Sequence, residues 1–154
     1  MTRRGAFKPA AVWQALSHLH KENAYMATTI RPATVLVIED HEPVRTLIEA
    51  VLETQGYIVL SAEDGAIGYE MARRYIPDII TLDLSMPNVD GHGALGYLKA
   101  DEKTRGIPVV IVSAWGDQLA GDDAKSAAAV ISKPFTVNDF TRTVAALLPA
   151  GNAI

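Results

Sequence analysis

The sequence predicts an α/β fold in which a parallel β-sheet lies between two layers of helices. Two observations predict it. Short β-branched segments without polar alternation suit strands that are covered on both faces, and helical segments separate these strands along the chain. The length of 154 residues fits one domain of ordinary size. The apolar fraction of 49% and charged fraction of 21% indicate an ordered globular protein.

Five segments are expected to form the strands. Three are strongly apolar and two are weaker members of the same series: residues 34–38, 79–82 and 109–112, then 57–62 and 128–132. Four clear helical segments alternate with them or follow the last one: residues 43–55, 66–75, 91–99 and 137–148. Alternation of this kind predicts a three-layer sandwich.

The first and last helices have the clearest signals. The first places its apolar residues on one face: Val44, Leu47, Ile48, Val51 and Leu52. It is expected to stop at Gly56, and Thr136 is a good N-cap for the last helix. Residues 115–127 are expected to give only a short, irregular helix, because each interior glycine costs about 1 kcal/mol relative to alanine.

Residues 1–33 form an expected N-terminal extension to a domain over residues 34–150. A helix is predicted near residues 9–24, with an apolar stripe that needs a partner surface on the domain or on a second copy. Met26 also begins a plausible shorter product, so the extension has two readings that the sequence leaves open.

Charge and composition exclude several classes of function. Residues 1–33 carry a net charge of +4 and the remainder carries −8. A body this acidic is a poor binder of nucleic acid, since phosphate contacts need cations. The apolar segments are too short to span a bilayer, no leader peptide is recognisable, and there are no cysteines. A cytoplasmic protein that binds neither DNA nor membrane is expected.

Polar side chains gather where the predicted strands end. Glu39 and Asp40 follow the first strand, while Asp83, Ser113 and Lys133 lie at the ends of the third, fourth and fifth. The carboxyl ends of parallel strands share one edge of a sheet, where ligands bind. Each residue alone has an ordinary structural explanation, such as capping a helix. Together they indicate a site.

The residue types in this site indicate its chemistry. Three carboxylates close together repel one another unless a cation lies between them. Oxygen ligands without His or Cys favour a hard ion, and few carboxylates favour a partly hydrated Mg²⁺. A lysine and a hydroxyl suit phosphoryl oxygens, and a carboxylate nucleophile can form an aspartyl phosphate.

Four motifs carry a family resemblance: VLVIEDHEPVR, ITLDLSMPNVDG, VVIVSAW and VISKPF. Together, from about Thr34 to Leu148, they resemble the receiver domain of two-component response regulators, of which the chemotaxis receivers are stand-alone examples. The resemblance implies a doubly wound, flavodoxin-like sheet with strand order 2-1-3-4-5. It also implies a phosphoprotein in a phosphorelay, and not an enzyme.

The resemblance implies a role for each residue of the site. Asp83 is the expected phosphoacceptor, supplied by a sensor histidine kinase or a histidine phosphotransfer protein. Mg²⁺ is the expected cofactor, bound by Asp40, Asp83 and the backbone carbonyl of Ser85. Glu39 is expected to act through a metal-bound water molecule.

The remaining residues of the motifs concern the phosphoryl group and the switch. Lys133 is expected to pair with the phosphoryl group. Ser113 is expected to be the switch hydroxyl, assisted by the Ala114 amide. The bond before Pro134 is expected to be cis, a geometry essentially confined to proline.

Three features depart from the family pattern. Val130 stands where the family usually has the switch aromatic, and the segment from Ser113 to Lys133 is about two residues shorter than usual. Trp115 lies two residues beyond Ser113. Our hypothesis is that its indole obstructs water and lengthens the lifetime of the phosphorylated state, although packing on the weak helix explains it equally well.

The expected function is that of a stand-alone receiver, because only six residues follow Leu148. Output then passes through a downstream protein target, onward phosphoryl transfer or homodimerisation. The alternative is a receiver-like interaction module that phosphorylation does not switch. A metal-dependent phosphatase is a weaker reading, since such enzymes need an acid where Ser85 stands.

Overall fold

The computed structural model describes residues 31–86, 91–114 and 121–148. The chain divides into two units at residues 31 and 32, and every described residue except Arg31 belongs to the second unit. The helix predicted near residues 9–24 lies outside the described residues. No helix in the described part is long and apolar enough to cross a membrane.

Five parallel strands form one sheet in the order β2-β1-β3-β4-β5, which confirms the predicted fold. The strands are β1 (Thr34–Ile38), β2 (Ile58–Ala62), β3 (Ile79–Leu82), β4 (Val109–Ser113) and β5 (Ala129–Ser132). The central strands β1, β3 and β4 are almost wholly buried, as their unbroken apolar sequences require. The edge strands β2 and β5 are only partly buried, which explains their weaker sequence signal.

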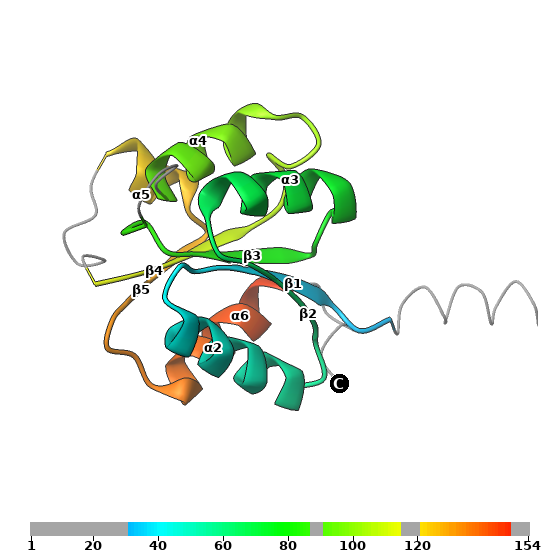
Figure 1. Ribbon diagram of the computed structural model, residues 1–154, viewed down its shortest axis with the longest axis vertical. Coiled ribbons are helices and arrows are strands. Elements are labelled where there is room, and N and C mark those ends of the chain that lie inside the picture. The colour runs from blue at the N-terminus through cyan, green and yellow to red at the C-terminus, as the bar shows by residue number, and fades with distance from the viewer. Residues whose placement is uncertain (1–30, 87–90, 115–120, 149–154) are drawn as a thin grey trace, which may run out of the picture. The chain divides into compact units, whose positions relative to one another are not determined.

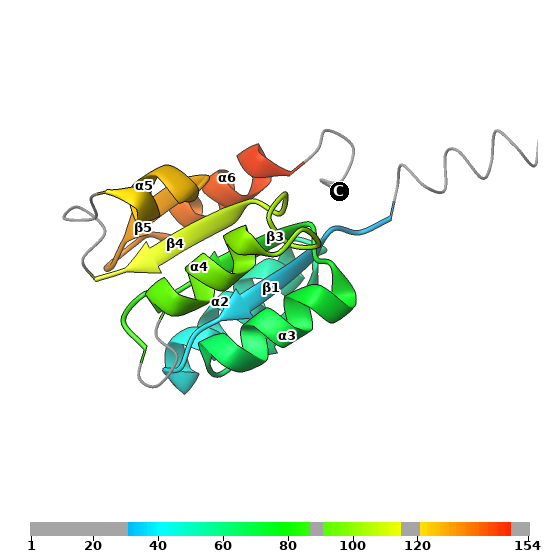
Figure 2. The same ribbon diagram turned by 90° about the horizontal axis from the view of Figure 1, so that it is seen from above.

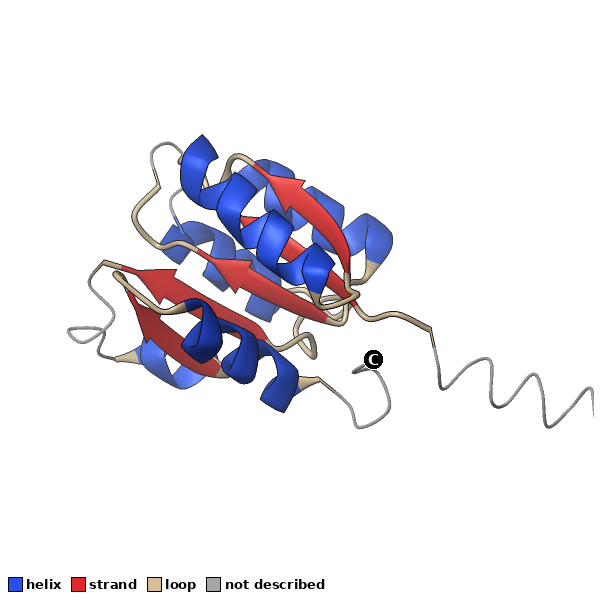
Figure 3. Cartoon of the chain, turned by 90° about the horizontal axis from the view of Figure 1, so that it is seen from below, coloured by secondary structure: helices blue, strands red, loops and turns tan. Residues whose placement is uncertain are grey.

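Helices cover both faces of the sheet. They are α2 (Glu42–Thr54), α3 (Gly65–Tyr75), α4 (Gly91–Ala100), α5 (Asp122–Ser126) and α6 (Val137–Leu147). In Figure 1, α3, α4 and α5 lie on one side of the sheet, and α2 and α6 lie on the other. Figures 2 and 3 show the same layers from above and from below.

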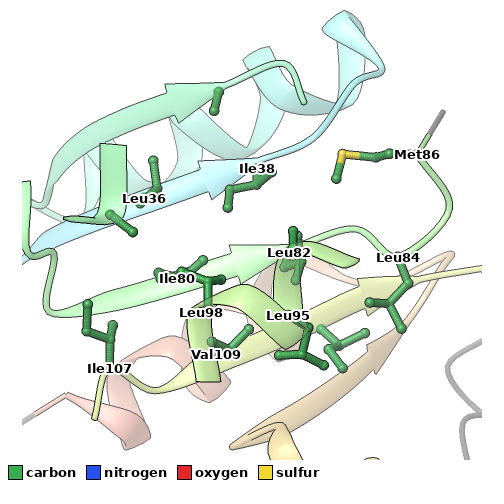
Figure 4. Packing of buried hydrophobic residues seen from close by; sticks show 14 residues of the cluster. Leu36, Ile38, Ile80, Leu82, Leu84, Met86, Leu95, Leu98, Ile107 and Val109 are labelled. Carbon is green, nitrogen blue, oxygen red and sulfur yellow. The ribbon is translucent and has the colours of Figure 1, made fainter. Parts of the chain in front are cut away.

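An apolar core lies on each face of the sheet, where the strands pack against the helices. One core lies under α3 and α4, and ten of its residues are labelled in Figure 4: Leu36, Ile38, Ile80, Leu82, Leu84, Met86, Leu95, Leu98, Ile107 and Val109. The other core joins the opposite face of the sheet to α2 and α6, with Leu52 and Phe140 among its fully buried side chains. Burying each such side chain contributes about 1.5–3 kcal/mol, so both faces hold the strand ends in fixed positions.

The predicted helix ends agree closely with the structure. Gly56 has a φ of 83° after the end of α2, a backbone conformation that favours glycine. The Thr136 side chain accepts a hydrogen bond from the Asp139 N–H at the start of α6. The segment before β5 gives the short helix that was expected, five residues long.

The apolar face of α2 is not uniformly buried. Leu47 belongs to the apolar face that the sequence predicts, but 51% of its surface is exposed. Ile48 and Leu52 are buried against the sheet. The apolar stripe is therefore narrower than the sequence suggests, and Leu47 lies on its outer margin.

Candidate functional site

Backbone hydrogen bonds carry the sheet one residue beyond its strands and so position the site. The Glu39 N–H donates to the Ala62 carbonyl at 3.1 Å, and the Asp83 N–H donates to the Ile38 carbonyl at 3.0 Å. The Lys133 N–H donates to the Ser113 carbonyl at 2.9 Å. Each functional side chain is thus fixed against the end of a neighbouring strand.

Three carboxylates meet at this edge, as the sequence predicts. Glu39, Asp40 and Asp83, which we call the acidic cluster, each offer a carboxylate oxygen within 4.8 Å of the other two. Glu39 and Asp83 are buried, at 2% and 5% exposure, while Asp40 is exposed. The cluster is therefore closed at its base and open to solvent at Asp40.

Lys133 supplies the positive charge beside this cluster. Its Nζ lies 2.8 Å from Glu39 Oε2 and 3.2 Å from Asp83 Oδ2. Burial lowers the pKa of the Lys133 ammonium, but the hydrogen bonds and attraction from these two carboxylates outweigh burial and raise the pKa above 10.5. Lys133 therefore stays protonated at neutral pH.

Burial has the opposite consequence for Glu39. Burial raises the pKa of its carboxyl from 4.5, and the charge of Asp83 acts in the same direction. Hydrogen bonds from Lys133 and from the His41 N–H lower the pKa, but the net shift is upward. Among these groups, three carboxylates face one ammonium, so the cluster has more acid than the single lysine can neutralise.

Local hydrogen bonds orient the Asp83 side chain. Its Oδ1 accepts from the Ser85 N–H at 2.9 Å, while Oδ2 faces Lys133. The Ser85 Oγ lies 3.4 Å from the Ser113 Oγ, and Ser113 is itself 2% exposed. The structure therefore brings together the residues that the sequence placed at four different strand ends.

Gly91 fixes the backbone of Asp83 from the other side. A Cβ at Gly91 would lie 2.1 Å from the Asp83 carbonyl oxygen and 2.3 Å from Leu84 Cα. No side chain fits there, so the first residue of α4 rests directly on the backbone of the central aspartate.

Arg45 is the contributor that sequence reasoning missed. Its Nη1 donates to the Glu39 carbonyl at 2.8 Å and to the Asp40 carbonyl at 3.4 Å. These contacts hold the turn between β1 and α2, which carries both acids. The only sequence signal is its place one turn into α2, where a long side chain can reach back to the preceding turn.

The other predicted residues have mixed outcomes. The peptide bond between Lys133 and Pro134 is cis, and Ala114 lies exposed just after β4. Val130 is in β5 with 38% of its surface exposed. Trp115 lies outside the described residues.

The family model for the response regulator receiver domain matches residues 35–145. The chain is 32% identical over 121 residues to the polar-differentiation response regulator DivK of Brucella anthropi, covering 76% of this chain and 97% of that protein. It is 38% identical over 117 residues to the DNA-binding dual master transcriptional regulator RpaA of Synechocystis sp., covering 74% of this chain. The match spans 48% of RpaA, about half its length.

Solved structures show the same fold. The receiver domain of a sensor histidine kinase from Pseudomonas aeruginosa aligns with a TM-score of 0.68 and 27% identity, over 76% of this chain and 98% of that one. That structure has a magnesium ion coordinated in its active-site cleft. A sensor protein from Polaromonas sp. aligns with a TM-score of 0.71 and 25% identity, covering 76% and 95% of the two chains.

Proposed function

Because the chain belongs to the response regulator receiver family, we propose that it is a switch controlled by phosphorylation of Asp83. The phosphoryl group comes from a sensor histidine kinase or a histidine phosphotransfer protein. One observation carries the proposal: the buried Asp83 carboxylate lies 3.2 Å from Lys133, within a cluster of three acids.

The acidic cluster fits a divalent cation. Three carboxylates against one ammonium leave an excess of negative charge, and oxygen ligands alone favour Mg²⁺. Asp40, Asp83 and the backbone carbonyl of Ser85 are the proposed ligands, with Glu39 acting through water. When bound, Mg²⁺ supplies positive charge to the oxygens of the transferring phosphoryl group.

The chain's own residues account for the other requirements of phosphoryl transfer. A carboxylate oxygen of Asp83 forms the new bond to phosphorus as the donor's bond to phosphorus breaks and its imidazole leaves. The Ser85 N–H holds one oxygen of Asp83 in place. Lys133 offsets the growing negative charge, and Ser113 with the Ala114 amide supplies hydrogen-bond donors to the product.

The output follows from the change of charge. Phosphorylation adds about −1.5 to −2 charges and three acceptor oxygens. In this proposal, the domain over residues 34–150 then changes its affinity for a downstream protein target or a second copy, as a cytoplasmic signalling protein and not as an enzyme. DNA binding is not carried over from RpaA, because the acidic body is a poor partner for phosphates.

The alternative is an interaction module that phosphorylation does not switch. Val130 favours it, because the switch aromatic of the family is replaced by a smaller, partly exposed side chain. The acidic cluster argues against it, since an unswitched module has no need to gather three repelling carboxylates.

Intact-mass measurement after incubation with Mg²⁺ and acetyl phosphate tests the proposal. The parent is expected to gain the mass of one phosphoryl group, and Asp83→Asn is expected to gain none. Asp78→Asn, at the opposite end of β3, is the matched control and should behave as the parent. A parent that binds Mg²⁺ but gains no mass would favour the unswitched module.

A further inference from the structure

α5 is the least anchored helix of the described domain. None of its five residues is buried, and Gly121 before it supplies no side-chain cap. Its ion pair between Lys125 and Asp122, at 4.0 Å, lies within the helix and is exposed. After the helix, the Ala128 N–H donates to the Val109 carbonyl at 2.8 Å, which fixes the start of β5 and not the helix itself.

A side-chain contact from α4 reaches this helix. His92 Nδ1, in the first turn of α4, forms a side-chain hydrogen bond with Asp123 Oδ2 in the first turn of α5. The two side chains are 52% and 33% exposed. α4 and α5 lie on the same face of the sheet, as Figure 1 shows. Among the described residues, this is the only side-chain hydrogen bond that ties α5 to another element.

The other end of this connection is the proposed phosphoacceptor. His92 follows Gly91, whose Cα lies so close to the Asp83 carbonyl that a Cβ would be 2.1 Å from it. The start of α4 therefore packs directly against the Asp83 backbone. A movement of that backbone toward α4 would displace the turn that carries His92.

We propose that the pair of His92 and Asp123 is a latch that holds α5 in place while Asp83 is unphosphorylated, and that phosphorylation opens it. This inference rests on the proposed function. In this proposal, the charge and the three oxygens that a phosphoryl group adds to the buried Asp83 carboxylate shift the backbone around it. A hydrogen bond is largely lost beyond about 3.5 Å, so a displacement of about 1 Å is enough to open the latch.

The latch gives this chain a route to its output face that does not need an aromatic at Val130. Its bistable element is α5, which has no buried side chain to hold it once the pair opens. In this proposal, phosphorylation releases α5 from α4. The release exposes the surface that lies between α5 and the start of α4.

Amide hydrogen exchange measured by NMR at Lys125 and Ala127 tests the latch, because both amides form the backbone hydrogen bonds of α5. In the parent, acetyl phosphate with Mg²⁺ is expected to accelerate exchange at least threefold. His92→Ala should exchange at the accelerated rate without phosphorylation and gain nothing further from it. Its mass gain at Asp83 should equal that of the parent.

Two further variants separate the latch from a general weakening of α5. Asp123→Ala and the double variant with His92→Ala should match the single His92→Ala variant, because one interaction can be lost only once. Lys125→Ala removes the internal pair of α5 and should retain the full response to acetyl phosphate.

The readouts distinguish the two proposals. A normal mass gain with unchanged exchange in the parent, or a full response in His92→Ala, would overturn the latch and leave the phosphorylation of Asp83 standing. A parent without any mass gain would overturn the proposed function and the latch together.

Discussion

Two groups of ionisable side chains lie at opposite ends of α4, and they are built in opposite ways. At the start of α4, the acidic cluster gathers three carboxylates, and the ammonium of Lys133 contacts two of them, Glu39 and Asp83. At its end, Asp101 is alone among donors: the Tyr69 hydroxyl and Arg73 Nε each lie 2.8 Å from its Oδ2. The first group is short of positive charge, and the second is fully satisfied.

For this reason the pKa values of Glu39 and Asp101 move in opposite directions. Burial raises the pKa of Glu39 in the acidic cluster. Hydrogen bonds from the Lys103 N–H and from Tyr69 lower the pKa of Asp101. Hydrogen-bond donors stabilise the charge of Asp101, which indicates a structural role. The carboxylates of the acidic cluster destabilise one another, which indicates a site for a ligand.

Gly91→Ala is expected to have the largest effect, because it breaks the contact between α4 and the acidic cluster. The new Cβ would lie 2.1 Å from the Asp83 carbonyl oxygen and 2.3 Å from Leu84 Cα, both backbone atoms that cannot move aside. We expect the free energy of unfolding in urea to fall by about 3 kcal/mol or more.

Gly96→Ala is the matched control in the same helix. Nothing lies within 4 Å of a Cβ at Gly96, so alanine there should stabilise the domain by about 0.5–1 kcal/mol through its higher helix propensity. Equal effects of the two substitutions would show that α4 does not rest on the backbone of Asp83.

Lys133→Met is expected to have the next largest effect. It removes the ammonium and keeps most of the apolar stem, which leaves two buried carboxylates without their cation. We expect a loss of about 2 kcal/mol, less than the roughly 3–5 kcal/mol for fully buried pairs, because Lys133 is partly exposed and Glu39 can take up a proton.

Added Mg²⁺ should affect the two ends of α4 differently. Lys133→Met should gain more stability from Mg²⁺ than the parent does, since the cation replaces the charge of the lost ammonium. Arg73→Met, which removes a cation from Asp101, should show no such gain over the parent. A Lys133→Met variant that responds to Mg²⁺ no more than the parent does would contradict the proposed metal site.

The two groups also differ in how far the sequence predicted them. The acidic cluster was predictable because strand ends in a parallel sheet share one edge, so residues as distant as Glu39 and Lys133 had to meet. The Asp101 group had no such rule. It depends on how α3 packs beside α4, which brings Tyr69 and Tyr97 to 5.6 Å between ring centroids. Side-chain packing between helices sets this geometry, and strand order alone does not specify it.

Details of helix packing that the sequence pattern does not specify also account for the outcomes at α5, His92 and Leu47. The irregular segment before β5 predicted a weak helix, and α5 is short. The hydrogen bond between His92 and Asp123 was not predicted, because His92 has no ligand pattern in the sequence and Asp123 lies 31 residues away. Leu47 matched the apolar period of α2, but the period does not say how wide a stripe the sheet covers.

Asp101→Asn is expected to have the smallest effect, with a dependence on pH opposite in sign to that of Glu39, whose pKa is raised. The pKa of Asp101 is lowered from 3.8 in the folded state, so the unfolded state binds more protons in that range. The stabilisation by its charge is fully present above pH 3.8 and is lost as the pH falls through the folded pKa. The difference in urea stability between parent and Asp101→Asn should therefore shrink as the pH is lowered below 3.8.

Lys103→Ala is the control, because it keeps the backbone N–H that contributes most to the shift. A difference between parent and Asp101→Asn that stays constant from neutral to acidic pH would mean that Asp101 is held by shape and not by its charge.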